Sequence, residues 1–151
     1  MRMSIQLEAT LIERPRDEVF TFFSDFENSP LWGRTIRTVK DSTGPIGVGT
    51  VFLEEARIMG RTMHHRSEVV VYDRPREFVY TNHFANGMSE RARFTFEPVD
   101  GGTLMNPEAE VEWAKVPQTL APLLSWQMKR HVRALFKTLK SVVEAADGPG
   151  V

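Results

Sequence analysis

The apolar residues of the chain follow two different periods. Over residues 116–146 they recur at steps of three and four, which is typical of one face of an amphipathic α-helix. At 1.5 Å per residue, a helix of about thirty residues is ~45 Å long and needs a large apolar partner surface. Pro117 suits its first turn, Pro122 lies deeper, where a proline bends a helix, and Gly148-Pro149 stops it. The apolar stripe comprises Leu120, Leu124, Met128, Val132, Leu135, Leu139 and Val143.

A period of two predicts strands in the rest of the chain. Residues 4–12 alternate, with Ile5, Leu7, Ala9 and Leu11 pointing one way, and predict one half-buried strand. From residue 35 onward the period is two again, and hairpin signals such as Asn86-Gly87 separate the runs, as in an antiparallel meander. These strands are predicted over residues 35–41, 50–59, 62–72, 77–84, 88–97 and 103–113.

Two short helical segments separate the first strand from the others. Pro15, with Asp17 and Glu18 behind it, opens one helix, and residues 26–32 form a second helical piece or turn. The order of elements predicts an α+β fold, in which a curved antiparallel sheet of about seven strands wraps around the long C-terminal helix. We expect one domain over residues 1–146, a loose tail over residues 147–151, and a cavity between the sheet and the first half of the helix.

Composition and charge narrow the function classes. The chain has 151 residues, 41% of them hydrophobic, which is enough for one domain with a real core. The net charge of −1 gives no attraction to nucleic acid, and the absence of cysteine excludes disulfides and thiol nucleophiles. No apolar run is long enough to span a membrane, so we expect a cytoplasmic protein without stable membrane insertion. The basic face of the long helix is interpreted as a solvated face.

Three local motifs, in this order, resemble the START-like superfamily, also called SRPBCC, and within it the polyketide cyclase/dehydrase type. They are the first helix over residues 15–25, Asn28-Ser29-Pro30-Leu31-Trp32, and the glycine-rich residues 44–50. Residues 135–144 are also similar to the closing helix of that family. The resemblance implies a helix-grip fold with a deep, largely apolar cavity. It implies no particular activity, because the superfamily includes lipid and sterol carriers, hormone receptors and aromatase/cyclases.

A few polar residues fall on predicted inward faces. His65 shares a strand face with Met63 and Val69, and is either a ligand-binding or acid–base group or a core histidine with a structural partner. Glu90 shares a face with Phe94 and lies either at an open rim or inside, where a carboxylate needs a partner or a proton. If it lies inside, a His65–Glu90 pair is one way to orient a ligand hydroxyl.

The strand over residues 77–84 leaves its inward face ambiguous. We favour Phe78, Tyr80, Asn82 and Phe84 inward, which makes Tyr80 and Asn82 polar handles on an apolar wall or satisfied core groups. The predicted cavity lining is His65, Tyr80, Asn82, Glu90, Phe94, Trp113, Leu124 and Met128.

The chain lacks the standard catalytic, phosphate-binding and dinucleotide-binding signatures, and its four histidines have no metal-ligand spacing. We therefore expect no metal and no cofactor. Three hypotheses remain: a module that binds a small hydrophobic molecule such as a lipid, aromatic polyketide or isoprenoid-like compound; an enzyme of the aromatase/cyclase type using the same polar groups; and a regulatory or interaction domain. A homodimer is compatible with each of them.

Overall fold

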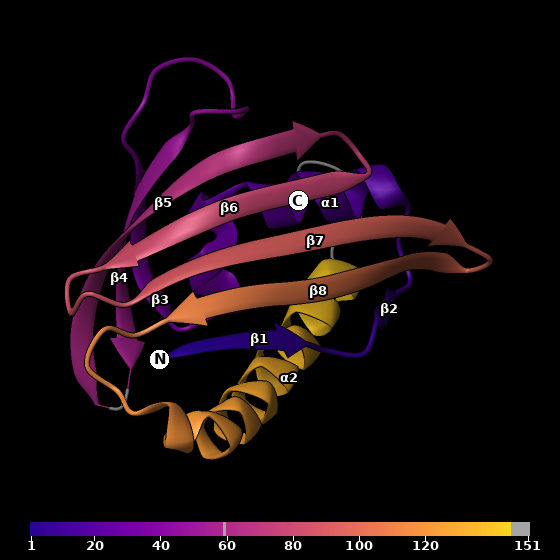
Figure 1. Ribbon diagram of the computed structural model, residues 1–151. Coiled ribbons are helices and arrows are strands. Elements are labelled where there is room, and N and C mark those ends of the chain that lie inside the picture. The colour runs from indigo at the N-terminus through magenta and orange to yellow at the C-terminus, as the bar shows by residue number, and fades with distance from the viewer. Residues whose placement is uncertain (59, 146–151) are drawn as a thin grey trace.

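The computed structural model describes residues 1–58 and 60–145 (Figure 1). Its elements follow the predicted order of strand, short helices, strands and long helix. They are β1 (Arg2–Gln6), β2 (Thr10–Ile12), α1 (Arg16–Ser24), η1 (Phe26–Leu31), β3 (Thr35–Lys40), β4 (Val51–Ile58), β5 (Arg61–Asp73), β6 (Glu77–Phe84), β7 (Ser89–Val99), β8 (Gly102–Glu112), η2 (Gln118–Leu120) and α2 (Ala121–Ala145).

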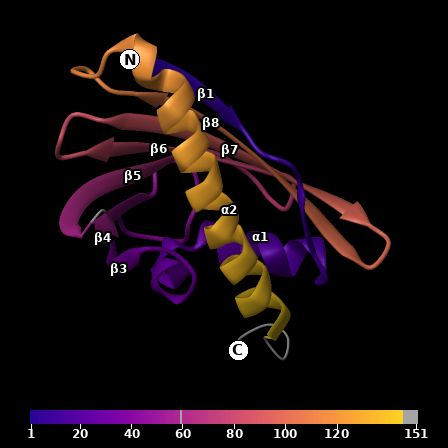
Figure 2. The ribbon, with the colours of Figure 1, turned by 90° about the horizontal axis from the view of Figure 1, so that it is seen from below.

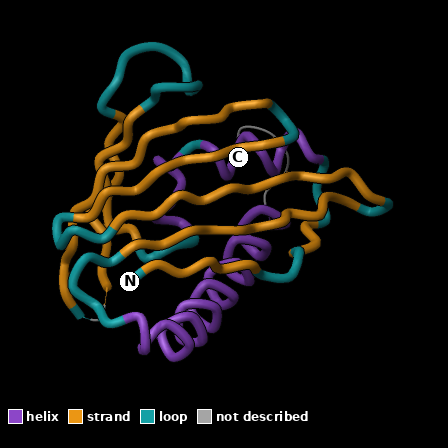
Figure 3. The backbone as a smooth tube through the Cα atoms, in the orientation of Figure 1, coloured by secondary structure: helices purple, strands orange, loops and turns teal. Residues whose placement is uncertain are grey.

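The strands form one antiparallel sheet in the order β1-β8-β7-β6-β5-β4-β3, and β2 also pairs with β8. The sheet curves, and α1 and α2 lie on its concave side (Figures 2 and 3). This arrangement confirms the predicted α+β helix-grip fold. Strand positions agree closely with prediction, and Gly60 and Gly87 turn two of the hairpins with φ angles of 76° and 88°.

The single strand predicted over residues 4–12 is wrong, since the structure has two strands there. β1 ends at Gln6, β2 begins at Thr10, and both pair with β8, which accounts for eight strands instead of seven. The break also changes which residues face inward. Ile5 is buried before it, whereas after it Ile12 is buried and Leu11 is 40% exposed. A strand interrupted by a loop can resume in the opposite phase, and a period-two pattern does not reveal that.

The long helix begins later than predicted. Val116 precedes it, Pro117 caps η2, and α2 starts at Ala121. Pro122 is thus in the first turn of α2 and not deeper in the helix as predicted, and its missing N–H has no partner to lose there. The expected tail lies outside the described residues.

Hydrogen bonds tie α2 at both ends. At its C-terminal end, Arg14 donates to the carbonyl of Glu144, and the Glu13 amide donates to the Glu144 carboxylate. Just before its N-terminal end, Gln118 of η2 exchanges two hydrogen bonds with the backbone of Arg2. The helix is therefore fixed to β1 at one end and to the segment after β2 at the other.

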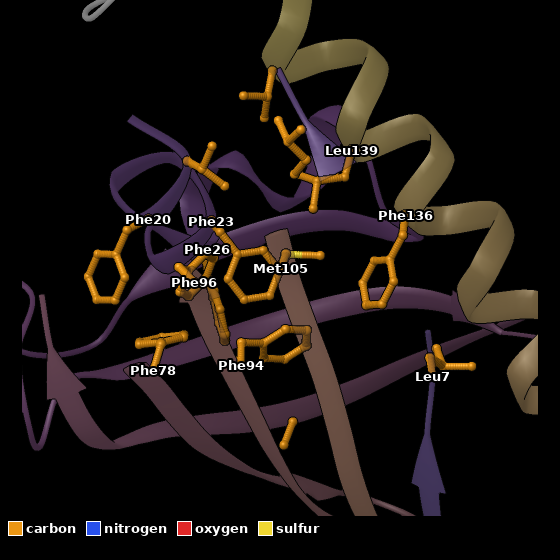
Figure 4. Close-up of a cluster of buried hydrophobic side chains, with 14 of the residues drawn as sticks. Leu7, Phe20, Phe23, Phe26, Phe78, Phe94, Phe96, Met105, Phe136 and Leu139 are labelled. Carbon is orange, nitrogen blue, oxygen red and sulfur yellow. The ribbon is translucent and has the colours of Figure 1, made fainter. Parts of the chain in front are cut away.

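The core is densest under the C-terminal half of α2 (Figure 4). The ring of Phe23 from α1 lies 4.4 Å from that of Phe94 on β7, which in turn packs edge-to-face against Phe136 of α2. Leu139 and Val143 complete the burial of this half of the helix. We call this region the aromatic end of the interior; its rings are Phe20, Phe23, Phe78, Phe94, Phe96 and Phe136.

The N-terminal half of α2 is packed much less closely. Leu123 and Trp126 are 54% and 56% exposed, and Arg130 lies over the Trp126 ring. Leu124 and Met128 are half-buried. The two halves of one amphipathic helix therefore meet the sheet differently: one half seals the core and the other leaves apolar side chains partly uncovered.

Candidate ligand site on the inner face of the sheet

One cross-strand row on the inner face contains a buried acidic side chain opposite a buried histidine. Thr38 of β3 lies opposite Glu54 of β4, Glu54 opposite His65 of β5, and His65 opposite Phe84 of β6. Directly opposed residues of antiparallel strands project on the same side. We call these four residues the inner row.

The centre of the inner row is a buried carboxylate–imidazole pair. His65 Nε2 lies 2.6 Å from Glu54 Oε2, and the two side chains are only 6% and 7% exposed. The Phe84 ring lies 4.6 Å from the imidazole ring and covers it. Glu54 was missed in the sequence analysis, although it alternates with the buried Phe52 and Ala56 and that phase predicts an inward side chain.

Several atoms of the inner row have no partner. Glu54 Oε1, His65 Nδ1 and Thr38 Oγ1 are buried without a hydrogen bond to any described residue, and so is Trp32 Nε1 at the end of η1. Buried polar atoms nearly always have a partner, because an unsatisfied one costs about 1–3 kcal/mol. Three such atoms in one row therefore call for a functional explanation.

A second polar chain runs beside the inner row. Ser67 Oγ donates to Asn82 Oδ1 over 2.5 Å, and Asn82 Nδ2 donates to Glu90 Oε1 over 2.9 Å. These bonds fix the orientation of the Asn82 amide. Glu90 projects inward rather than at an exposed rim, and its hydrogen-bond partner is Asn82, whereas that of His65 is Glu54.

Burial shifts the pKa of two groups here. It raises the pKa of Glu90, against the opposing effects of the Asn82 hydrogen bond and the nearby His65. Burial also raises the pKa of Tyr80 well above its ordinary value, and the charges of Glu90 and Glu54 raise it further. The Tyr80 hydroxyl therefore keeps its proton at neutral pH and is available as a donor.

The remaining predicted lining residues do not lie together at the inner row. Phe94 is buried in the aromatic end, and its ring stacks on that of Tyr80. Trp113 and Met128 are partly buried against the core, and Leu124 is half-buried on α2. Contact of any of these residues with a ligand stays a prediction.

One side-chain bridge joins α2 to the segment between η1 and β3. Arg34 Nη2 lies 2.8 Å from His131 Nδ1, so the guanidinium donates and the imidazole accepts. Partial burial lowers the pKa of His131, and the adjacent charge of Arg34 lowers it further, which favours the neutral acceptor form. The bridge lies beside the loosely packed half of the helix.

Two hollows open mainly on the outward face of the sheet. One of about 550 Å³ is lined mainly by outward residues such as Arg37, Leu53 and His64. Its lining also includes Glu54, His65 and Phe84 of the inner row. Another of about 400 Å³ lies over Thr81 and Arg91. What distinguishes the inner row from the outward face is therefore its set of unpartnered buried polar atoms.

Within residues 1–58 and 60–145, no cluster of three or more His, Asp or Glu side chains is placed to hold a metal ion. Over the same residues, no helix has the length and apolar character needed to cross a membrane.

Solved structures with this fold include several related proteins. The chain is 12% identical to the ZhuI aromatase/cyclase from Streptomyces sp. R1128, with a TM-score of 0.79 and 100% of both chains covered. It is 19% identical to a START superfamily protein from Mycobacterium smegmatis, with a TM-score of 0.74, covering 95% of this chain and 97% of that one. At these identities the likeness shows the fold alone.

Family-level sequence similarity is more specific. Among curated proteins, no significant match to the chain was found. Residues 4–144, however, match the family described as polyketide cyclase / dehydrase and lipid transport. This match confirms the resemblance seen in the motifs, and the chain belongs to that family.

Proposed function

We propose that the protein binds a small, largely apolar molecule between the inner face of the sheet and the N-terminal half of α2. The observation that carries this proposal is the set of unpartnered atoms in the inner row: Thr38 Oγ1, Glu54 Oε1 and His65 Nδ1. A ligand with one polar end would supply their missing partners. The membership of the chain in a family that includes lipid transport supports the same class of ligand.

The surroundings of the inner row favour an apolar ligand body. Tyr80 packs edge-to-face against Phe26 and stacks on Phe94, so rings adjoin the polar groups on the side of the aromatic end. Burial of apolar ligand surface would contribute about 25 cal/mol per Å² before ordering costs are subtracted. The polar row would then fix orientation, and the apolar contacts would provide most of the affinity.

Access to the row requires side chains to move, because its unpartnered atoms are out of contact with solvent. The half-buried Leu124 and Met128 of α2 are the side chains best placed to give way, since this half of the helix is the less tightly packed. Movement of a few side chains on binding is common in proteins whose backbones hardly change.

A direct test combines retention and competition. Native mass spectrometry of the purified protein is expected to reveal a co-purifying apolar compound. The fluorescent probe N-phenyl-1-naphthylamine is expected to bind with enhanced emission. Leu124→Trp should fill the site and reduce probe binding at least about tenfold, whereas Leu123→Trp, at an exposed neighbouring position, should not. Equal probe binding by both variants, or no binding by the parent protein, would contradict the proposal.

An aromatase/cyclase-type activity is the second candidate, and the Glu54–His65 pair is the observation that favours it. An imidazole held by a carboxylate is a common general base. Turnover of an aromatic polyketide that is lost in His65→Phe, with the fold intact, would establish it. Cytoplasmic location and homodimer formation stay predictions.

A further inference from the structure

The register of β4 and β5 places two Glu–His pairs next to each other, one on each face of the sheet. Glu54 lies opposite His65 on the inside, and Glu55 lies opposite His64 on the outside. The outer histidine is exposed, whereas the inner pair is more than nine-tenths buried. Of these two pairs, only the inner one has buried atoms without a hydrogen-bond partner, so the pairs share strands and residue types but not surroundings.

We propose that Glu54 and His65 form a proton-accepting dyad whose ligand is an apolar molecule carrying a weakly acidic hydroxyl group, such as a phenol or an enol. This inference rests on the proposed function, because it assigns the chemistry of the polar end of the ligand. It goes beyond binding by giving the two residues distinct roles.

The atoms left without partners define what the ligand must offer. His65 Nε2 faces Glu54 Oε2 at 2.6 Å, and an imidazole beside a carboxylate donates that N–H to it. Nδ1 then carries a lone pair, and Glu54 Oε1 has lone pairs as well, so both atoms are acceptors. The nearby Asn82 amide already donates to Glu90. A ligand hydroxyl supplies a proton to these acceptors, whereas an ether or carbonyl oxygen does not.

The proton transfer that this geometry allows is simple. The O–H bond of the ligand breaks, a bond forms between the proton and His65 Nδ1, and the electron pair stays on the ligand oxygen. The resulting imidazolium is stabilised by the Glu54 carboxylate at Oε2. His65 is therefore the residue that contacts the ligand, and Glu54 acts through Oε2 as a positioning residue that fixes the ring and its tautomer.

The first measurement compares two probes of nearly the same shape, 2-naphthol and 2-methoxynaphthalene. Only the naphthol can donate a hydrogen bond, and in its excited state it is a strong acid that transfers its proton to an adjacent base. We expect the naphthol to bind about tenfold more tightly than its methyl ether and to emit from the naphtholate form when bound.

Variants then assign the proton acceptor. His65→Phe should abolish the tenfold preference and return emission to the neutral form, while binding of the methyl ether changes less than about twofold. Glu54→Gln should reduce naphtholate emission without preventing binding. His64→Phe and Glu55→Gln are the matched controls, since they alter the outer pair on the same strands. Circular dichroism and urea unfolding verify that each variant is folded.

A second measurement needs no substitution. In ¹⁵N NMR of the parent protein, His65 is expected to carry its proton on Nε2 and none on Nδ1, and Glu54→Gln should mix the two tautomers. A proton on Nδ1 with Nε2 unprotonated would overturn the dyad. Equal binding of both probes, with neutral emission that His65→Phe does not change, would also overturn it while leaving the proposed function intact. If 2-naphthol, 2-methoxynaphthalene and N-phenyl-1-naphthylamine all fail to bind, the proposed function fails and the dyad proposal fails with it.

Discussion

The two ends of the interior differ in their side chains: one is packed with aromatic rings, and the other contains the buried polar groups of the inner row. At the aromatic end, rings from α1, β6 and β7 belong to one buried cluster with Phe136 and Leu139 of α2, and Phe94 of β7 contacts Phe136 (Figure 4). The other end contains the inner row, and the N-terminal half of α2 leaves Leu123 and Trp126 exposed.

The difference indicates a division between stability and function. Close packing of apolar rings stabilises a fold, whereas a buried carboxylate–imidazole pair with unpartnered atoms stabilises it little or not at all. A protein that retains such a pair gives up stability at that position, as binding and catalytic sites commonly do. The aromatic end therefore supports the fold, and the inner row is the part to which the proposed function is assigned.

Substitution at the aromatic end should have the largest effect on stability. Phe23→Ala removes a ring that packs against Phe94, Phe78 and Trp32 and leaves a cavity, so the free energy of unfolding should fall by about 3–5 kcal/mol. Urea denaturation followed by circular dichroism measures this loss. A loss below about 1 kcal/mol would mean that this end is not the densely packed part of the interior.

The opposite sign is expected at the inner row. Replacement of Glu54 and His65 together by Leu should leave the free energy of unfolding unchanged or raise it by up to about 4 kcal/mol, because two buried polar groups are removed together. Each single Leu variant should be less stable than the double variant, since it leaves one partner buried alone. A double-mutant cycle measures the coupling, and additive losses would contradict the pairing.

Glu90 provides a pH-dependent test of the same end. Its pKa in the folded protein is raised from the ordinary 4.5, so the folded state holds the proton more tightly than the unfolded chain does. The stability that this protonation contributes is fully present below pH 4.5. It is lost as the pH rises through the pKa that Glu90 has in the folded protein. Glu90→Gln, which keeps an acceptor for Asn82, should therefore gain stability relative to the parent protein as the pH rises.

Urea unfolding of the parent protein and of Glu90→Gln, from below pH 4.5 to neutral pH, measures the difference in their free energies of unfolding. Glu97→Gln, an exposed position on the same strand, corrects for the loss of one carboxylate. A difference between parent and Glu90→Gln that stays constant with pH would contradict the burial of this carboxyl group.

The smallest effect on stability is expected at Leu123, an exposed apolar position of α2. Leu123→Ala should change the free energy of unfolding by no more than about 0.5 kcal/mol, because the side chain is 54% exposed. Thermal unfolding should give nearly identical transitions for this variant and the parent. A loss comparable to that of Phe23→Ala would remove the contrast between the two ends of the interior.

The sequence predicted well which side of the sheet a strand residue lies on, but it did not predict which residue it contacts across the strands. Alternation correctly placed His65, Asn82 and Phe84 on the inner side, because a strand's period of two is a local property. It did not reveal that His65 pairs with Glu54, since that contact depends on the register between strands and on side-chain rotamers. The break between β1 and β2 was missed for a similar reason: it is imposed by pairing with β8 and not by the local pattern.

The hydrogen bonds that tie both ends of α2 have a consequence for how a ligand would enter under the proposed function. Outward rotation of α2 would break its hydrogen bonds to Arg2 near one end and to Arg14 at the other. Under the proposed function, a ligand would instead enter by rotamer changes along the span between these hydrogen bonds, where Leu124 and Met128 lie. The size of the entering molecule is then limited by how far those two side chains can turn aside.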